Sequence, residues 1–103
     1  MAGRQGSSPL YLDDLLIDPA RREVSVNGQP VQLRAQEFDL LIVLAEHKSL
    51  VLTREQLLEK AWGYEFVGQS RTVDVHIGHL RRKISASRVQ IETVTGVGYK
   101  LVA

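Results

Sequence analysis

Apolar residues recur along the chain with the period of helices in three places. Between residues 71 and 85 they recur at i, i+4, i+7 and i+11, the spacing of a helix with one buried face. The residues of this stripe are Val73, Ile77, Leu80 and Ile84. A broader apolar face over residues 35–47 predicts a helix buried on two sides. A third helix is predicted after Thr53, because the stretch TREQ matches a capping box and Gly63 supplies a C-terminal stop.

Short extended segments precede and follow these helices. Residues 10–33 contain four candidates separated by turn residues, and Asn27-Gly28 is the strongest hairpin pattern because both residues accept a positive φ. Residues 49–53 are also predicted to be extended. The chain ends on a predicted β-hairpin, with the glycines of residues 95–98 at its turn. The extended segments therefore form an N-terminal antiparallel sheet of three or four strands and a C-terminal hairpin.

The order of the elements predicts an α+β fold of the winged helix-turn-helix class, in which three helices separate an N-terminal antiparallel sheet from a hairpin wing. A loop of about seven residues at 63–69 joins the last two helices. Ser70 is a candidate N-cap for the final, basic helix. In such an arrangement the final helix is the one that enters a DNA groove.

Length and hydrophobicity are those of one small soluble domain. We expect it at residues 9–103 of the 103-residue chain, after a linker or cloning remnant at residues 1–8. No apolar stretch approaches the roughly 18 residues of a membrane span, and the N-terminal residues lack the apolar core of a signal peptide. We therefore expect a cytoplasmic protein with no membrane partner.

The net charge of +1 conceals an uneven distribution. Residues 1–70 hold seven Lys or Arg and ten Asp or Glu, whereas residues 71–103 hold six and two. The first part therefore carries a charge of −3 and the second +4, with Arg81, Arg82 and Lys83 consecutive on the last predicted helix. This concentration of positive charge predicts a polyanionic partner such as nucleic acid. A basic helix that is merely solvated stays open as the alternative.

The sequence lacks the residue patterns on which common enzymes depend. It has no cysteine, no paired nucleophile and base, and no glycine-rich phosphate loop between a strand and a helix. His76 and His79 share a helical face, but two histidines beside a run of arginines do not predict a metal site. Asp13 and Asp14 lie in a predicted turn, where aspartate is common for conformational reasons. We therefore expect no catalytic residue, no metal and no cofactor.

Four stretches together resemble the DNA-binding output domain of OmpR/PhoB-type response regulators. They are LRAQEFDLL, TREQLLEKAWG, SRTVDVHIGHLRRKI and IETVTGVGYKL, and the resemblance covers residues 10–102. It implies a transcription regulator of a two-component system that binds double-stranded DNA. It also implies a phosphorylatable receiver domain on the N-terminal side, which is absent from this chain. Two copies, monomeric when free, are expected to bind direct-repeat half-sites about one helical turn apart.

The outward face of the helix over residues 71–85 is expected to read bases in the major groove. Val75 lies in the middle of this otherwise polar face, and a valine there suits the C5-methyl group of thymine. A valine covered by a neighbouring loop is the alternative. His79 and Arg82 flank it. By resemblance, His79 stands where relatives often carry a base-reading arginine; a histidine can donate to guanine but cannot form arginine's fork.

Cations on the sides of this helix suit the phosphates that border the groove. Arg71 stands at its start, and His76 and Arg81 lie toward its sides. The resemblance places all three at phosphate-contacting positions and adds Trp62, Thr72, Thr93 and Tyr99. For Trp62 and Tyr99 most of the ring is expected in the core, with the indole N–H and the hydroxyl reaching outward.

The predicted wing differs from that of relatives at one residue, and the helix-joining loop has two interpretations. Relatives carry a minor-groove arginine where Thr95 stands, so readout by the wing, at Thr95 and Gly96, is expected to be weaker. Lys100 is a candidate phosphate contact. The loop over residues 63–69 matches one that contacts RNA polymerase, through Tyr64, Glu65 and Phe66. Packing of its aromatic pair against the domain itself is the alternative.

Two further expectations concern the first helix and the function as a whole. Arg34 stands where relatives carry a capping threonine, so Glu37 loses its reciprocal partner, at a cost of about 1 kcal/mol of stability. The alternative function is a protein-binding winged-helix module without sequence-specific DNA readout. A steep salt dependence of binding would distinguish DNA binding from this alternative.

Overall fold

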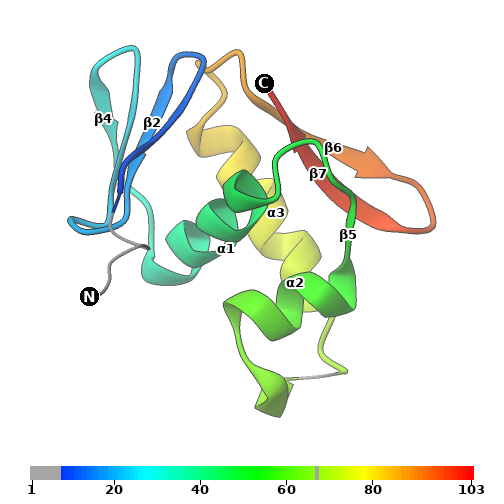
Figure 1. Cartoon of the computed structure of the whole chain (residues 1–103). Coiled ribbons are helices and arrows are strands. Elements are labelled where there is room, and N and C mark those ends of the chain that lie inside the picture. The colour runs from blue at the N-terminus through cyan, green and yellow to red at the C-terminus, as the bar shows by residue number, and fades with distance from the viewer. Residues whose placement is uncertain (1–7, 67) are drawn as a thin grey trace.

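The structure, a computed structural model, describes residues 8–66 and 68–103. The linker expected at residues 1–8 therefore lies outside the described residues, apart from Ser8. In chain order the elements are β1 Leu10–Leu12, β2 Leu15–Asp18, β3 Glu23–Val26, β4 Gln29–Val31, α1 Ala35–Glu46, β5 Leu52–Thr53, α2 Arg54–Ala61, the 3-10 turn η2 Tyr64–Phe66, α3 Arg71–Lys83, β6 Gln90–Val94 and β7 Gly98–Val102 (Figure 1).

The N-terminal sheet has the strand order β1-β2-β3-β4, each strand antiparallel to the next. Its buried face consists of alternate residues, as a half-exposed sheet requires: Leu15, Ile17, Val24 and Val26. The predicted hairpin is confirmed, since Asn27 and Gly28 join β3 to β4 with φ of 51° and 80°. The fourth strand begins at Gln29, because the two-residue turn pairs Val26 directly with Gln29, and it ends at Val31.

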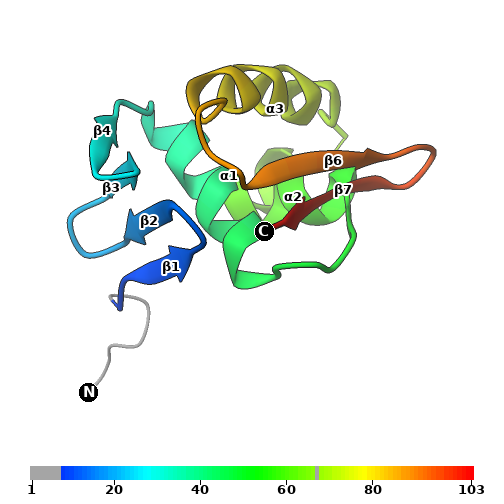
Figure 2. The same cartoon turned by 90° about the horizontal axis from the view of Figure 1, so that it is seen from above.

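Helix α1 lies at the centre of the molecule, between the N-terminal sheet on one side and α2, α3 and the hairpin on the other (Figure 2). The breadth of its apolar face reflects this position. Its buried apolar residues point in several directions around the helix: Phe38, Leu40, Leu41, Val43, Leu44 and Ala45. The prediction of a helix buried on two sides is therefore confirmed.

The C-terminal sheet has the order β5-β7-β6, so the hairpin β6–β7 gains a short third strand from the segment before α2. Only Leu52 and Thr53 of the extended stretch predicted at 49–53 form this strand, and they pair with Tyr99 and Gly98. The turn of the hairpin projects away from the helices as a wing (Figure 1). Because Gly98 belongs to β7, the wing turn is shorter than the range 95–98 predicted from the glycines.

Three local predictions around α2 and α3 have different outcomes. The capping box of α2 is confirmed: Thr53 Oγ1 accepts from the Gln56 N–H at 3.0 Å, and Gln56 Oε1 accepts from the Thr53 N–H at 2.8 Å. Ser70 was predicted to cap α3, but its backbone is helical, with φ −65° and ψ −18°, and its side chain makes no capping hydrogen bond within the described chain. Helix α3 ends at Lys83, not at residue 85, and the loop after α2 contains the 3-10 turn η2.

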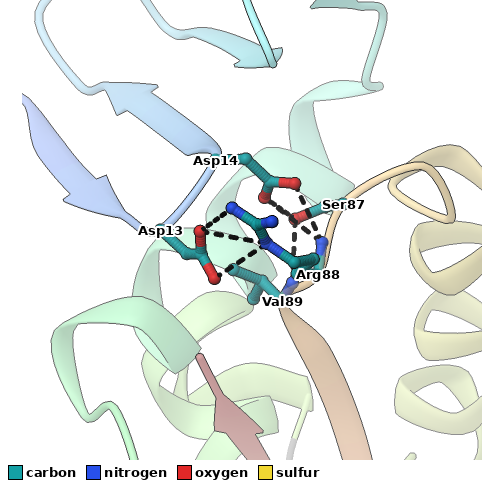
Figure 3. A network of polar contacts seen from close by, with 5 residues as sticks. All are labelled: Asp13, Asp14, Ser87, Arg88 and Val89. Carbon is teal, nitrogen blue, oxygen red and sulfur yellow. Dashed lines mark hydrogen bonds and ion pairs between the residues drawn. The ribbon is translucent and has the colours of Figure 1, made fainter.

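A polar network joins the β1–β2 turn to the segment between α3 and β6 (Figure 3). The carboxylate of Asp14 accepts from the Ser87 hydroxyl at 2.6 Å and from the Arg88 backbone N–H at 3.0 Å. The guanidinium of Arg88 reaches the neighbouring Asp13 at 2.7 Å. Residues predicted as ordinary turn aspartates therefore attach the N-terminal sheet to the chain that leads from α3 into the wing.

Part of the stabilisation that this network provides is expected to be lost at acid pH. The Ser87 hydroxyl, and then the Arg88 N–H and charge, outweigh desolvation and hold the pKa of Asp14 below its ordinary value. A carboxylate with a depressed folded pKa stabilises the fold above its unfolded pKa of about 4, and this contribution is lost as pH falls through the folded value. We expect Asp14→Asn to lower the unfolding free energy at pH 7, with a difference from wild type that shrinks below about pH 4. Urea denaturation at several pH values measures this difference; one that did not change with pH would contradict it.

Candidate nucleic-acid interface

The outward face of α3 is exposed and cationic around a single valine. Val73, Ile77 and Leu80 on the opposite face are at most 1% exposed, which fixes the rotation of the helix against the core. Val75 is 55% exposed, so no neighbouring loop of the described chain covers it. Arg71 and Arg82 are exposed on the same face. An exposed valine between two arginines offers both an apolar contact and charge to a partner.

On the side of α3 that faces the hairpin, Arg81 holds the wing. Its guanidinium donates from Nε and Nη2 to the Ile91 carbonyl at 2.9 and 2.7 Å. Nη2 also donates to Thr93 Oγ1 at 2.8 Å, and the guanidinium lies 5.5 Å from the centre of the Tyr99 ring. The residue predicted as a phosphate contact therefore also connects the helix to β6.

A second set of contacts on this side joins Tyr99 to two residues that the sequence did not single out, Asp74 and Arg54. Asp74 accepts from the Tyr99 hydroxyl at 2.5 Å and from Arg54 Nε at 2.7 Å. Burial alone would raise the pKa of Asp74, but the hydrogen bonds from Tyr99 and Arg54 lower it below its ordinary value. Burial, and then the bond to Asp74, raise the pKa of Tyr99. Arg54 lies within the stretch TREQ, whose pattern indicates a capping box and says nothing about a partner for the charge of Arg54.

These contacts correct the expectation for Tyr99. Its ring is in the core, as predicted, and is 5% exposed. The hydroxyl was expected to reach outward, but it donates its hydrogen to Asp74. A phosphate oxygen only accepts hydrogen bonds, so this hydroxyl offers it no donor in the observed arrangement. Tyr99 therefore helps to position Asp74 and Arg54.

On the opposite side of α3, Trp62, which directly follows α2, packs against His76. The ring centres are 5.1 Å apart in an edge-to-face arrangement, and Trp62 is half-buried, as predicted. His76 Nδ1 lies 2.8 Å from the carbonyl oxygen of Thr72, an acceptor, so this nitrogen carries the hydrogen. The other ring nitrogen of His76 therefore donates only when the ring is protonated.

Farther along this side, α3 contacts the first turn of α1 through a buried carboxylate. Glu37 is 1% exposed, and its Oε1 accepts from the Arg34 N–H at 2.9 Å and from Lys83 Nζ at 2.6 Å. Burial raises the pKa of Glu37, but Lys83 and the Arg34 N–H outweigh this effect and hold the pKa below its ordinary value. Half of the capping box is thus retained although the Arg34 side chain has no acceptor. His79 lies beside this carboxylate, with Nδ1 3.7 Å from Oε2.

The remaining predicted contact residues lie outside α3, in the wing and in the helix-joining loop. Thr95 and Gly96 are exposed at the wing turn, and Lys100 is half-buried on β7. In the loop, Tyr64 is 76% exposed and Glu65 is exposed, whereas Phe66 packs against the core. The aromatic pair is therefore divided between solvent and core. Val67 of this loop lies outside the described residues.

The described part of the chain contains neither a metal-binding cluster nor a membrane-spanning helix. No group of three or more His, Asp or Glu side chains gathers there in a way that could hold a metal ion. Among the helices of residues 8–66 and 68–103, none is long and apolar enough to cross a membrane. The cationic face of α3 and the adjacent wing thus stand out as the candidate interface.

Known proteins similar to this chain are transcriptional regulators. A family model described as "Transcriptional regulatory protein, C terminal" matches residues 28–101. The transcriptional regulatory protein PrrA of Mycobacterium leprae is 48% identical over 97 residues, which are 92% of this chain and 42% of PrrA. The chain therefore spans about two fifths of this relative's length.

Solved structures of DNA-binding domains have the same fold. The DNA-binding domain of CpxR from E. coli is 35% identical with a TM-score of 0.84, over 94% of this chain and 98% of that one. The DNA-binding domain of RstA from Klebsiella pneumoniae, solved in complex with the RstA box, is 34% identical with a TM-score of 0.82. That match covers 91% of this chain and 96% of the RstA chain. The α+β winged helix-turn-helix predicted from the sequence is thus confirmed.

Proposed function

The chain belongs to the family of C-terminal, DNA-binding domains of OmpR/PhoB-type transcriptional regulators, and we propose that it binds double-stranded DNA sequence-specifically through α3 and the wing. The family is one of regulators and not of enzymes, as the sequence predicts. The observation that carries the proposal is the exposure of Val75, 55%, at the centre of a cationic helix face.

In this proposal α3 enters the major groove, which accommodates one helix. Val75 contacts the C5-methyl group of thymine. This contact stabilises the complex because it removes apolar surface of both groups from water. Arg71 and Arg82 lie about 16 Å apart along the helix axis, given a rise of 1.5 Å per residue. Arg82, and His79 on the flank, then reach base edges, while Arg71 reaches a bordering phosphate.

Phosphate contacts border this helix on both sides. Thr72, His76 and Trp62 contact the phosphates of one strand from the α2 side. On the wing side, Thr93 accepts from Arg81 and keeps its own hydroxyl hydrogen for a phosphate. The wing lies over the adjacent minor groove with Thr95 and Gly96, and Lys100 on β7 supplies a further phosphate contact.

The assembly on DNA and the protein partners are also proposals. Two copies bind direct-repeat half-sites about one helical turn apart, and the free domain is monomeric. A receiver domain precedes this domain in the regulator. RNA polymerase contacts the loop after α2, where Tyr64 and Glu65 are exposed and Phe66 anchors the turn to the core.

We predict that Val75→Ala weakens binding to the preferred site by about fivefold and leaves binding to random DNA nearly unchanged, because it removes apolar contact but no charge. The preferred site comes from selection with a randomised duplex pool, followed by titration at several salt concentrations. Val51→Ala is the matched control, since Val51 is 39% exposed just before β5, outside the proposed interface.

A specific observation also favours the protein-binding alternative, because an exposed valine suits a protein partner. The same titration separates the two functions. Enrichment of a tandem repeat with a salt slope of several phosphates supports DNA readout. A pool without enrichment and a flat slope would contradict it and make Val75 a contact for a protein.

A further inference from the structure

The buried carboxylate of Glu37 has one oxygen fully engaged and one without a partner. Oε1 accepts both the Arg34 N–H and the Lys83 ammonium. Oε2 is closed to solvent and has no hydrogen-bond partner among the described residues. Since water does not reach it, only a protein group can donate to this oxygen.

His79 supplies the neighbouring polar atom. Its Nδ1 is 3.7 Å from Oε2, which is longer than a hydrogen bond. Lys83 and the Arg34 N–H hold the pKa of Glu37 below its ordinary value, so the carboxylate is ionised and can only accept. A ring nitrogen facing an obligate acceptor carries the hydrogen, which selects the Nδ1–H tautomer of His79.

Nδ1 is the ring nitrogen of His79 that is paired with Glu37, which leaves Nε2 for another partner. The side chain is 35% exposed and lines a surface groove together with Arg34, Arg82 and Lys83. In the Nδ1–H tautomer of the neutral ring, Nε2 has a lone pair and no hydrogen. When the ring is neutral, Nε2 therefore presents an acceptor to whatever occupies the groove side of α3.

We propose that Glu37 is a positioning residue that makes His79 a reader of amino groups in the major groove. An acceptor pairs with the exocyclic amine of adenine or cytosine, whereas guanine O6 and thymine O4 are acceptors themselves. His79 thus selects a base with an amino group, in contrast to the guanine expected from the sequence. The inference rests on the proposed function, because it assumes that α3 lies in the major groove.

Glu37→Gln is expected to reverse this preference. Arg34 and Lys83 both donate to the position of Oε1, so the amide oxygen stays there and the amide nitrogen replaces Oε2. That nitrogen donates to Nδ1 and leaves the hydrogen of the ring on Nε2. The ring then presents a donor, and the selected base changes to guanine or thymine. The ring itself and its position on α3 are unchanged by the substitution.

Two measurements test the proposal, and the first needs no DNA. Nitrogen-15 NMR of the free domain at pH 8, where an imidazole is ordinarily neutral, identifies the tautomer of His79. We expect Nδ1–H in wild type and Nε2–H in Glu37→Gln. Wild type with Nε2–H would overturn the role of Glu37 whether or not the domain binds DNA, and whether or not the variant folds.

The second measurement is selection from the randomised duplex pool with wild type, Glu37→Gln, His79→Ala and His79→Arg. His79→Ala identifies the base pair that depends on residue 79. There we expect wild type to favour adenine or cytosine by about tenfold, and Glu37→Gln and His79→Arg to favour keto bases. Enrichment by wild type with no position sensitive to His79→Ala would overturn the readout but leave the proposed function intact. A pool with no enrichment at all would overturn both.

Discussion

Replacing Gly98 with alanine is expected to lower the free energy of unfolding by about 3 kcal/mol, at the upper end of typical overpacking effects. An added Cβ would lie 2.0 Å from the Leu52 carbonyl oxygen and 2.8 Å from Thr53 Cα. Both are backbone atoms of β5, so no side chain can rotate to make room. The strand must move away from β7, and its two ladder pairs must weaken.

The displacement would extend from the sheet to the helices. Thr53 pairs with Gly98 in the sheet and also caps α2, so moving β5 disturbs the first turn of that helix. Arg54, the next residue, holds Asp74 of α3. The loss of stability in Gly98→Ala should therefore be accompanied by weaker DNA binding, although Gly98 has no side chain to contact DNA.

Denaturant unfolding of Gly98→Ala and Gly78→Ala makes a matched comparison. Gly78 lies inside α3, and a Cβ there would meet no atom within 4 Å. Alanine at this position should raise stability by about 1 kcal/mol, because glycine is the weaker helix former. Equal effects of the two substitutions, or a Gly98→Ala domain as stable as wild type, would contradict the close approach of β5 to β7.

The parts of the fold that could be predicted from the sequence are those that short-range rules determine. Asn27-Gly28 formed the expected hairpin because a two-residue turn requires positive φ at both positions. The stretch TREQ formed a reciprocal capping box because both partners lie within four residues. The period of Val73, Ile77 and Leu80 gave the rotation of α3, and with it the exposure of Val75.

Contacts between distant residues could not be predicted in this way. Lys83 lies 46 residues from Glu37, and nothing in the local pattern of either residue indicates that the two meet. The same holds for Ser87 and Asp14, which are 73 residues apart. Ser70 shows the opposite failure, because a residue of a suitable type at a helix start does not cap when its own backbone is already helical.

The candidate site depends both on short-range patterns, which the sequence shows, and on contacts between distant residues, which it does not show. Its exposed residues follow from helical period and charge, but the state in which they are presented depends on tertiary contacts. The Tyr99 hydroxyl was expected to donate to a partner outside the domain, but it donates to Asp74. His79 was expected to act alone and lies against Glu37. Sequence patterns thus identify which side chains are exposed, and packing decides what each of them can donate or accept.

Arg81→Ala is expected to have the second large effect, because this residue holds the wing and is also a proposed phosphate contact. Its guanidinium donates to the Ile91 carbonyl and to Thr93, and no contact of the described chain engages Nη1. Hydrogen bonds from a charged donor predict a loss of about 2 kcal/mol of stability in Arg81→Ala. Loss of one phosphate contact should weaken binding to all sequences and lower the slope of log K against log salt by about 0.9.

Arg81→Lys separates the two roles. The ammonium keeps the charge, so the salt slope should stay near that of wild type, but it cannot form the fork that grips Ile91 and Thr93. Arg21→Ala is the control for charge alone, because Arg21 is 74% exposed on the N-terminal sheet, outside the proposed interface. If Arg81→Ala lost stability with an unchanged salt slope, Arg81 would only hold the wing. If the salt slope fell while the free energy of unfolding was unchanged, the strand pairs of β6 and β7 would be sufficient to stabilise the wing. Arg81 would then contribute only to DNA binding.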